Sequence, residues 1–199
     1  MLHDPNDWVM FSQNDLAASM NAERSALHFH AERGNESRIL VEIGGGLKLT
    51  LRAMRIEDLP QVVAIEAQSH LEPWTQEAFR AELETSLVAQ PFVALRKEEI
   101  VGYIVPWFVA EELQVANITV KENFRQRGMG RLLLAHALHL AEERHCRIAY
   151  LEVRGSNAAA RALYESMGFV VEGVRPKYYG RAQEDAILMK KDLLEAVTR

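Results

Sequence analysis

A single cysteine, Cys146, is present in this chain of 199 residues. One cysteine excludes an internal disulfide framework and supplies too few thiolates for a cysteine-based metal site, so we expect no bound metal. No apolar run reaches the ~18 residues that a membrane-spanning helix needs. The segment around Asp4 and Asp7 also lacks the basic and then apolar regions of a signal peptide. These absences predict a cytoplasmic protein without a membrane partner.

Positive charge is not in excess either. The chain carries 23 Lys and Arg against 28 Asp and Glu, for a net charge of -5. Because a nucleic-acid binder shows a basic footprint, we expect no direct nucleic-acid partner. The hydrophobic fraction of 48% is typical of a globular protein and excludes a wholly disordered chain.

Three consecutive glycines, Gly44, Gly45 and Gly46, divide the chain. Glycine runs resist both helix and strand, so this segment is typical of a flexible joint. Residues 1–46 hold seven acidic and three basic side chains and only a thin apolar face. We predict that they form an acidic N-terminal extension that is poorly ordered or loosely docked, and dispensable for activity. Residues 47–199 form the globular domain.

Hydrophobic periodicity is clear after the glycines. Alternating apolar residues predict strands, and apolar residues spaced three and four apart predict helices. The predicted strands cover residues 47–51, 92–95, 100–109, 113–120, 148–153, 169–174 and 185–190. The predicted helices cover residues 58–69, 75–85, 129–144 and 156–167. This order predicts an α/β (α+β) fold with a mixed central sheet of about seven strands and flanking helices.

The apolar positions of the fourth predicted strand change phase. Leu113 and Val115 are odd-numbered, whereas Ile118 and Val120 are even-numbered. One extra residue near Ala116 would place both pairs on one face, as a β-bulge does, although imperfect patterning explains the change equally well. Since a bulge separates a strand from its neighbour and frees backbone groups, we predict a bulged, splayed fourth strand.

A loop with two glycines follows this strand and leads directly into the next helix. Its sequence is Arg125-Gln126-Arg127-Gly128-Met129-Gly130-Arg131. The glycines let backbone amides surround a ligand, and the helix adds unpaired N–H groups and the positive end of its dipole. The loop therefore predicts an anion site suited to a pyrophosphate, although a tight turn explains a G-x-G equally well. It lacks the ending of a P-loop and the third glycine of a Rossmann fingerprint.

Glu152 has the chemistry for proton transfer. It shares a strand face with Ile148 and Tyr150 and lies between the bulky residues Leu151 and Val153. A carboxylate in such surroundings is a candidate general base near neutral pH. The alternative is a strand-end glutamate that points to water.

The helix predicted at residues 156–167 carries a second candidate. Asn157, Arg161 and Tyr164 are spaced i, i+4, i+7 and share one face. Tyr164 can donate a proton, or can be an amphipathic core residue with its hydroxyl in water. Cys146 has no glycine-rich or histidine-paired context, and we interpret it as an inert packing residue.

Together these segments resemble the GCN5-related N-acetyltransferase (GNAT) superfamily. The R-x-x-G-x-G loop is similar to that superfamily's acetyl-CoA pyrophosphate motif. The stretch from Leu151 to Phe169, which contains Ser156-Asn157-Ala158-Ala159-Ala160, looks like the bacterial RimI-type ribosomal-protein alanine N-acetyltransferases. Further segments that look like this subfamily are Pro73-Trp74-Thr75, Lys177-Tyr178-Tyr179 and Glu184-Asp185-Ala186. The likeness covers about residues 47–192.

The resemblance implies a role for each candidate residue. Glu152 would be the general base and Tyr164 the general acid. Acetyl-CoA would be the co-substrate, with no metal. The residues implied to hold it are Ile118, Thr119 and Val120 at the pantetheine arm, Gln126, Arg127, Gly128, Met129, Gly130 and Arg131 at the pyrophosphate, and Asn157.

The resemblance also implies the reaction. It is direct transfer, in a ternary complex, of an acetyl group to the N-terminal alanine of a ribosomal protein, namely small-subunit ribosomal protein eighteen. One alternative is a GNAT enzyme that acts on a lysine side chain or a small amine. The other is a non-catalytic module that binds acyl-CoA. The presence of both Glu152 and Tyr164 favours an enzyme.

Overall fold

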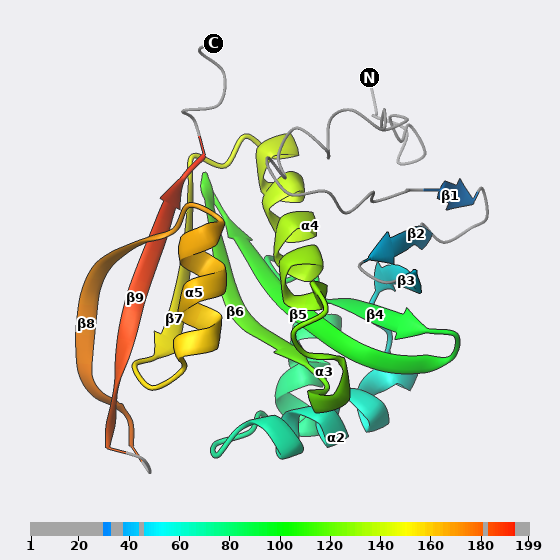
Figure 1. Ribbon diagram of the computed structural model, residues 1–199, viewed down its shortest axis with the longest axis horizontal. Coiled ribbons are helices and arrows are strands. Elements are labelled where there is room, and N and C mark those ends of the chain that lie inside the picture. Colours follow the sequence, from blue (N-terminus) through cyan, green and yellow to red (C-terminus); the bar gives the residue numbers. More distant parts are fainter. Residues whose placement is uncertain (1–29, 33–37, 44–45, 181–182, 194–199) are drawn as a thin grey trace.

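One mixed sheet organises the molecule (Figure 1). The computed structural model describes residues 30–32, 38–43, 46–180 and 183–193. Within these residues, nine strands have the spatial order β1-β2-β3-β4-β5-β6-β7-β9-β8. Neighbouring strands run antiparallel except β6 and β7, which are parallel.

All seven predicted strands and all four predicted helices are present, with small shifts at their ends except in β8, which continues to Tyr179 although the strand was predicted to end at residue 174. They correspond to β3–β9 and α2–α5. The strands are β1 (His30–Glu32), β2 (Arg38–Ile43), β3 (Leu47–Ala53), β4 (Phe92–Arg96), β5 (Glu99–Val109), β6 (Glu112–Val120), β7 (Ile148–Arg154), β8 (Val170–Tyr179) and β9 (Glu184–Asp192). The helices are α2 (Leu59–Ser69), α3 (Gln76–Glu84), α4 (Met129–Glu143) and α5 (Ala158–Ser166), with short 3-10 turns η1 (Ile56–Asp58) and η2 (Glu122–Phe124).

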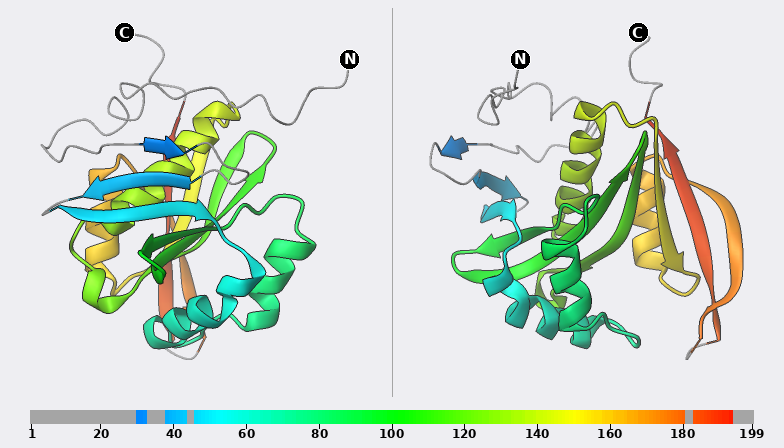
Figure 2. Two further views of the ribbon diagram at one scale, coloured as in Figure 1. Left: turned by 90° about the vertical axis from the view of Figure 1, so that its right-hand side faces the viewer. Right: turned by 180° about the vertical axis from the view of Figure 1, so that it is seen from behind.

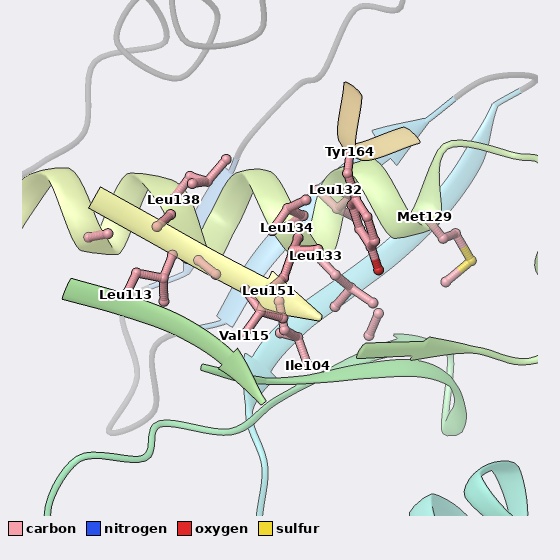
Figure 3. Close-up of a cluster of buried hydrophobic side chains, with 14 of the residues drawn as sticks. Ile104, Leu113, Val115, Met129, Leu132, Leu133, Leu134, Leu138, Leu151 and Tyr164 are labelled. Carbon is pink, nitrogen blue, oxygen red and sulfur yellow. The ribbon is translucent and has the colours of Figure 1, made fainter. Parts of the chain in front are cut away.

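Helices cover both faces of the sheet. Helices α4 and α5 pack on one face, over a core that includes Leu113, Leu133 and Leu151 (Figure 3). Helices α2 and α3 pack on the other face, where the rings of Phe79 and Tyr103 meet edge to face at 5.4 Å. The sheet is thus the middle layer, and both of its faces are buried over the central strands.

Short-range contacts fix where α2 and α3 begin. Arg52 of β3 forms two hydrogen bonds, of 2.6 and 2.8 Å, with the carboxylate of Asp58 just before α2. Pro60 occupies the first turn of α2, where its missing N–H costs nothing. Thr75 caps α3 by accepting a hydrogen bond from Ala78 N at 3.2 Å. The connection between these two helices contributes residues to the site.

The structure corrects the predicted domain boundary for residues 38–43. This segment is β2, which runs beside β3 (Figure 2). The two strands pair along the whole length of β2, so that Ile43 lies opposite Leu47. Val41 and Ile43 are 2% and 6% exposed and belong to the core beneath α4. The glycine run indicated a joint, whereas the chain reverses direction there to form a hairpin, with a φ of 77° at Gly46. The rest of the predicted extension, apart from β1, lies outside the described residues: 1–29, 33–37, 44 and 45.

The predicted bulge is present in β6. The register with β5 steps from the pair Val105–Asn117 to the pair Pro106–Val115, which leaves Ala116 as the extra residue. The apolar residues before and after the bulge consequently pack in the same core, beneath α4 and α5. The change of phase in the sequence therefore has the predicted cause.

Candidate active site

The site begins where β6 and β7 separate. Their pairing ends at Val115 and Leu151, although β6 continues to Val120 and β7 continues to Arg154. On its other side, β6 stays paired with β5. We call the unpaired stretch between residues 116–120 of β6 and the end of β7 the strand gap. It confirms the splayed strand that the sequence predicted.

Backbone groups of β6 face the strand gap. Lys121 N donates a hydrogen bond to Val101 O at 2.9 Å, which marks a hydrogen-bonded pair at the end of the β5–β6 ladder. Bonded and non-bonded pairs alternate in an antiparallel ladder. The N–H and C=O groups of Ile118 and Val120 therefore point away from β5, into the strand gap. Those of Thr119 point toward β5, and its side chain is buried on the α2 side.

The glycine loop ends at a helix terminus without a side-chain cap. Gly128 is the N-cap of α4 and has a left-handed backbone with a φ of 85°. The first intrahelical bond runs from Leu132 N to Gly128 O at 2.9 Å. The N–H groups of Met129, Gly130 and Arg131 precede this bond and are available to a ligand. A Cβ on Gly128 would meet no atom within 4 Å, so the space beside it is open.

The first turn of α4 lies against α5. Arg131 Nη2 donates a hydrogen bond to Ser166 Oγ at 2.6 Å. A Cβ on Gly130 would lie 3.0 Å from Leu163 Cδ2, so a glycine is needed for this close approach. Met129 is 1% exposed and its side chain packs in the core, so the side chain is not available to a ligand.

Arg125 fixes the start of the same loop. Its Nε donates to Val120 O at 2.9 Å, and its Nη2 donates to Ser69 Oγ at 3.0 Å. The loop is thereby tied to the end of β6 and the end of α2. Gln126 and Arg127 are exposed beyond this anchor, and Gln126 has a φ of 58°.

Helix α5 carries two of the predicted site residues. Tyr164 is 6% exposed, and Figure 3 shows its ring extending from α5 beside the first turns of α4, with the hydroxyl directed toward the sheet. Burial raises the pKa of Tyr164 to about 12, and Tyr179 adds to the shift. The phenol therefore keeps its proton at neutral pH, as a general acid must. Asn157 caps α5, with Oδ1 accepting from Ala160 N at 3.1 Å, and its Nδ2 remains as a donor.

Glu152 lies on the other face of the sheet. Leu151 and Val153 point into the core beneath α4 and α5, so Glu152 points to the α2 and α3 side. Its carboxylate is ion-paired with Arg175 of β8, and its charge raises the pKa of the nearby Tyr178. The pattern of β7 showed only the bulky neighbours along the strand. The charged neighbour comes from β8, two strands away.

The end of β7 also meets the C-terminal hairpin. The Arg154 guanidinium lies 3.8 Å from the centroid of the Tyr179 ring and 3.5 Å from Glu184 Oε2. Glu184 Oε1 accepts a hydrogen bond from Ser156 N at 2.6 Å. Two of the segments that carried the subfamily resemblance thus pack against the end of β7, beside the strand gap.

Sequence reasoning missed a buried polar cluster beside the strand gap. It consists of Glu66, His70, Tyr103, Asn117 and Thr119, and we call it the Glu66 cluster. The Glu66 carboxylate accepts hydrogen bonds from Asn117 Nδ2 at 3.2 Å and from the Tyr103 hydroxyl. His70 contacts both Glu66 and Thr119. The available signal was a glutamate on the apolar face of α2, where an unpartnered carboxylate would be costly.

The described residues also bear on the expectations for metal ligands, membrane-spanning helices and Cys146. No group of three or more His, Cys, Asp or Glu side chains in the described ranges is arranged to hold a metal ion. None of the helices seen there has the length and apolar character needed to cross a membrane. Cys146 lies in the core, and burial raises the pKa of its thiol, which confirms the packing role.

This geometry fits an acyl-CoA. The N–H and C=O of Ile118 and the N–H of Val120 can bind the amide-containing pantetheine arm as an added strand would, while Val120 O accepts from Arg125. The uncapped start of α4 can bind a pyrophosphate through N–H groups and the helix dipole. A proton acceptor, Glu152, and a proton donor, Tyr164, lie on the two faces beside the strand gap. Fold and site together define an acyl-CoA-dependent acyltransferase.

Comparisons with known proteins identify the family. Residues 59–169 match the family model of the acetyltransferase (GNAT) family. The chain is 37% identical over 142 residues to the ribosomal protein bS18-alanine N-acetyltransferase of Salmonella typhimurium, which covers 70% of this chain and 95% of that protein. It is 35% identical over 157 residues to N-alpha-acetyltransferase RimI of Mycobacterium tuberculosis, which covers 72% of this chain and 92% of that protein.

A solved structure agrees with these matches. The crystal structure of the ribosomal-protein-S18-alanine N-acetyltransferase from Escherichia coli is similar with a TM-score of 0.67 and 33% identity, over 73% of this chain and 94% of that one. The chain belongs to the GNAT family. It is an acetyltransferase, and acetyl-CoA is its co-substrate.

Proposed function

We propose that this enzyme acetylates the N-terminal alanine of a ribosomal protein of the bS18 type in the cytoplasm. The observation that carries the proposal is the alignment with the Salmonella and Escherichia coli enzymes named for this reaction, which spans 95% and 94% of their chains. The match to the family model, residues 59–169, also includes the α2–α3 connection, whose His70 contacts Thr119 beside the strand gap. One element that would border the acceptor is thus part of the family likeness.

Glu152 and Tyr164 divide the proton transfers between them. Bound acetyl-CoA supplies an activated acetyl thioester. Glu152, on the α2 and α3 side, accepts a proton from the α-amine, directly or through water. Tyr164, on the α4 and α5 side, donates its proton to the departing sulfur. The remaining predicted residues bind and orient: Ile118 and Val120 by their backbone, and the first turn of α4 by its N–H groups.

The chemistry of the acceptor also favours an α-amine over a lysine side chain. An α-amine has an ordinary pKa of about 7.7–8.0, whereas that of lysine is about 10.4. At pH 7 roughly a tenth or more of an α-amine is neutral, but well under a hundredth of a lysine side chain is. Glu152, which is paired with Arg175, therefore faces an easier first deprotonation with an α-amine than with a lysine side chain.

A peptide panel tests the proposal. The enzyme is assayed with acetyl-CoA and three peptides of one sequence: one with a free N-terminal alanine, one with that alanine already acetylated but with internal lysines, and one beginning with proline. We expect turnover of the first peptide only. Turnover of the blocked peptide would assign a lysine acetyltransferase, and tight acetyl-CoA binding without turnover of any amine would assign a binding module.

A further inference from the structure

Acetylation of an N-terminal ammonium takes two protons from one nitrogen. The ammonium group has three N–H bonds and the product amide has one. Glu152 can accept only one of these protons at a time, since a carboxylate becomes a neutral carboxylic acid when it binds one proton. Tyr164 donates a proton rather than accepting one. A second acceptor close to the nitrogen would let both protons leave within one turnover.

His70 is placed for this task. Its Nε2 lies 2.8 Å from Thr119 Oγ1, which belongs to β6 beyond the last β6–β7 pair. The positive charges of Arg154 on β7 and Arg125 before α4 also act on the ring. The imidazole therefore lies against the β6 wall of the strand gap, on the same side of the sheet as Glu152. Its side chain is 34% exposed, so an acceptor amine can reach it.

The hydrogen bonds of the Glu66 cluster determine which ring nitrogen is free. Thr119 Oγ1 donates to Asn117 Oδ1 at 3.3 Å, so toward His70 Nε2 it acts as an acceptor. Glu66 Oε2, 3.3 Å from the same nitrogen, only accepts. With acceptors on both contacts, Nε2 carries the ring proton and Nδ1 keeps its lone pair. Nδ1 has no hydrogen-bond partner in the part of the chain that the structure describes.

Glu66 cannot turn away from the imidazole. It is 1% exposed, and its Oε1 accepts hydrogen bonds from Trp74 N at 3.0 Å and Asn117 Nδ2 at 3.2 Å. Its Oε2 accepts from the Tyr103 hydroxyl as well as facing His70. A carboxylate held in this way orients a histidine, fixes its tautomer and stabilises the imidazolium that forms on protonation.

The ring is neutral at the pH at which the enzyme would work. Burial lowers the pKa of His70 below its ordinary value, Glu66 opposes this shift, and Arg154 and Arg125 add to it. The remaining titratable group of the cluster, Tyr103, keeps its proton because burial and Glu66 raise its pKa. Nδ1 is therefore free to accept a proton at pH 7 and above.

We propose that His70 Nδ1 is the second proton acceptor of the acetyl transfer; this inference rests on the proposed function, because it requires an ammonium substrate. Glu152 takes the first proton and leaves a neutral amine. The nitrogen lone pair then forms the C–N bond to the thioester carbonyl carbon, and the second N–H proton passes to His70 Nδ1. The C–S bond breaks with its electron pair on sulfur, which Tyr164 protonates.

The test compares His70→Gln with Glu152→Gln across pH. In His70→Gln the amide nitrogen replaces the Nε2–H donor to Thr119 and Glu66, but the base is lost. We expect kcat/KM for the alanine peptide to fall at least about tenfold at every pH between about 7 and 9.5. The loss persists because the second proton leaves only after the C–N bond has formed. The Glu152→Gln loss shrinks over this range, because the amine is then already neutral.

His145→Gln, a change to an exposed histidine after α4, is the matched control and should keep the parent rate. A His70→Gln enzyme within twofold of the parent overturns the proposal. So does a His70→Gln loss that disappears at high pH. Nitrogen NMR of the His70 ring tests the proposal without a substrate, since it reports which ring nitrogen carries the proton. A proton on Nδ1 rather than Nε2 in the neutral ring would also overturn the proposal.

The parent enzyme separates this inference from the proposed function. If the parent acetylates the alanine peptide and His70→Gln does so at the same rate, only the role of His70 is contradicted. If the parent acetylates only a lysine peptide or a small amine, the proposed function fails. The same variants are then compared on that amine, whose ammonium also loses two protons.

Discussion

Glu152 and Tyr164 lie on opposite faces of the sheet, beside the point where β6 and β7 separate. Glu152 is on the α2 and α3 side with Arg175, and Tyr164 is in the core beneath α4 and α5. An amine and a thiol can therefore meet the same carbonyl carbon from different sides. Because we propose different proton transfers for the two groups, we expect their variants to fail in different ways.

Replacement of Glu152 by Gln should give a loss that depends on pH. The change keeps the shape but removes the proton acceptor, so turnover should fall about 10²–10⁴-fold at low pH, where the amine is mostly protonated. Part of the rate should return at high pH. Glu172→Gln, which breaks a similar cross-strand ion pair with Lys190 at 2.9 Å, is the control for loss of a surface charge. Equal pH profiles for the parent and Glu152→Gln would place the base elsewhere.

Replacement of Tyr164 by Phe should lower turnover without weakening acetyl-CoA binding. The ring and its contact with Phe169, 6.2 Å between centroids, are retained, so only the proton donor is lost. We expect a kcat decrease of about 10²–10⁴-fold, measured by release of free thiol. A thioester with a more acidic thiol should recover part of the rate. Tyr150→Phe on β7 should behave as the parent, and a Tyr164→Phe enzyme within about twofold of the parent would reduce Tyr164 to a core residue.

Much of the fold follows from local patterns in the sequence. The seven strands and four helices after Gly46 have strong periodicity. The odd-to-even change around Ala116 indicated either a bulge or imperfect patterning, and the register of β6 with β5 shows the bulge. β2 was missed because Gly44–Gly46 outweighed the alternating pattern of residues 38–43. A glycine run permits a flexible joint and a hairpin turn alike, and only the pairing with β3 distinguishes them.

Local patterns indicated part of the geometry of the candidate site. The order of glycines in the loop indicated the uncapped start of α4. Helical spacing placed Tyr164 on one face with Asn157 and Arg161, but it left the burial of the ring open. The partners of Glu152 and the Glu66 cluster were not predictable in this way. Arg175 reaches Glu152 across β9, and Asn117 reaches Glu66 from a segment 51 residues away. Such contacts depend on the topology of the sheet.

Replacement of Gly128 by Val should weaken acetyl-CoA binding while leaving the fold intact. A β-branched residue is strained at a φ of 85° and would place its side chain beside the uncapped N–H groups of α4, which we expect to bind the pyrophosphate. We expect Kd to rise at least about tenfold, or about 1.4 kcal/mol, by calorimetry. Gly168→Val is the matched control, because the φ of 87° at Gly168 imposes a similar backbone strain at a position away from the loop. An unchanged Kd for Gly128→Val would mean that the loop is only a turn.

Removal of residues 1–46 should cost more stability than removal of residues 1–37. The longer deletion takes away β2 and with it Val41 and Ile43, which are almost fully buried. Burial of each such side chain contributes about 1.5–3 kcal/mol, so the free energy of unfolding should fall by several kcal/mol. The shorter deletion keeps β2 and should lower the free energy of unfolding by much less. Urea unfolding of the two shortened chains and the parent measures this difference, and equal midpoints would show that β2 adds nothing to the core.

His136 should make the protein less stable as the pH falls below neutrality. His136 lies on the buried face of α4. Its ring meets that of Phe92 edge to face, with 4.5 Å between centroids, and its Nε2 has no hydrogen-bond partner within the described residues. Burial lowers its pKa to about 3, with smaller contributions from His139 and Arg144. The unfolded chain, with an ordinary histidine pKa of about 6.5, therefore binds the proton more readily than the folded chain.

The contribution of neutral His136 to the free energy of unfolding is fully present above about pH 6.5. It is lost progressively as the pH falls toward 3, by on the order of 1 kcal/mol per pH unit. Replacement of His136 by Leu keeps an apolar side chain at this position and removes the titration. The free energy of unfolding in urea should then fall less steeply between about pH 7 and pH 5 than it does in the parent, whereas His145→Leu should leave the parent slope unchanged. Parallel pH dependence in the parent and His136→Leu would show that the imidazole reaches solvent and that acid instability arises from other groups.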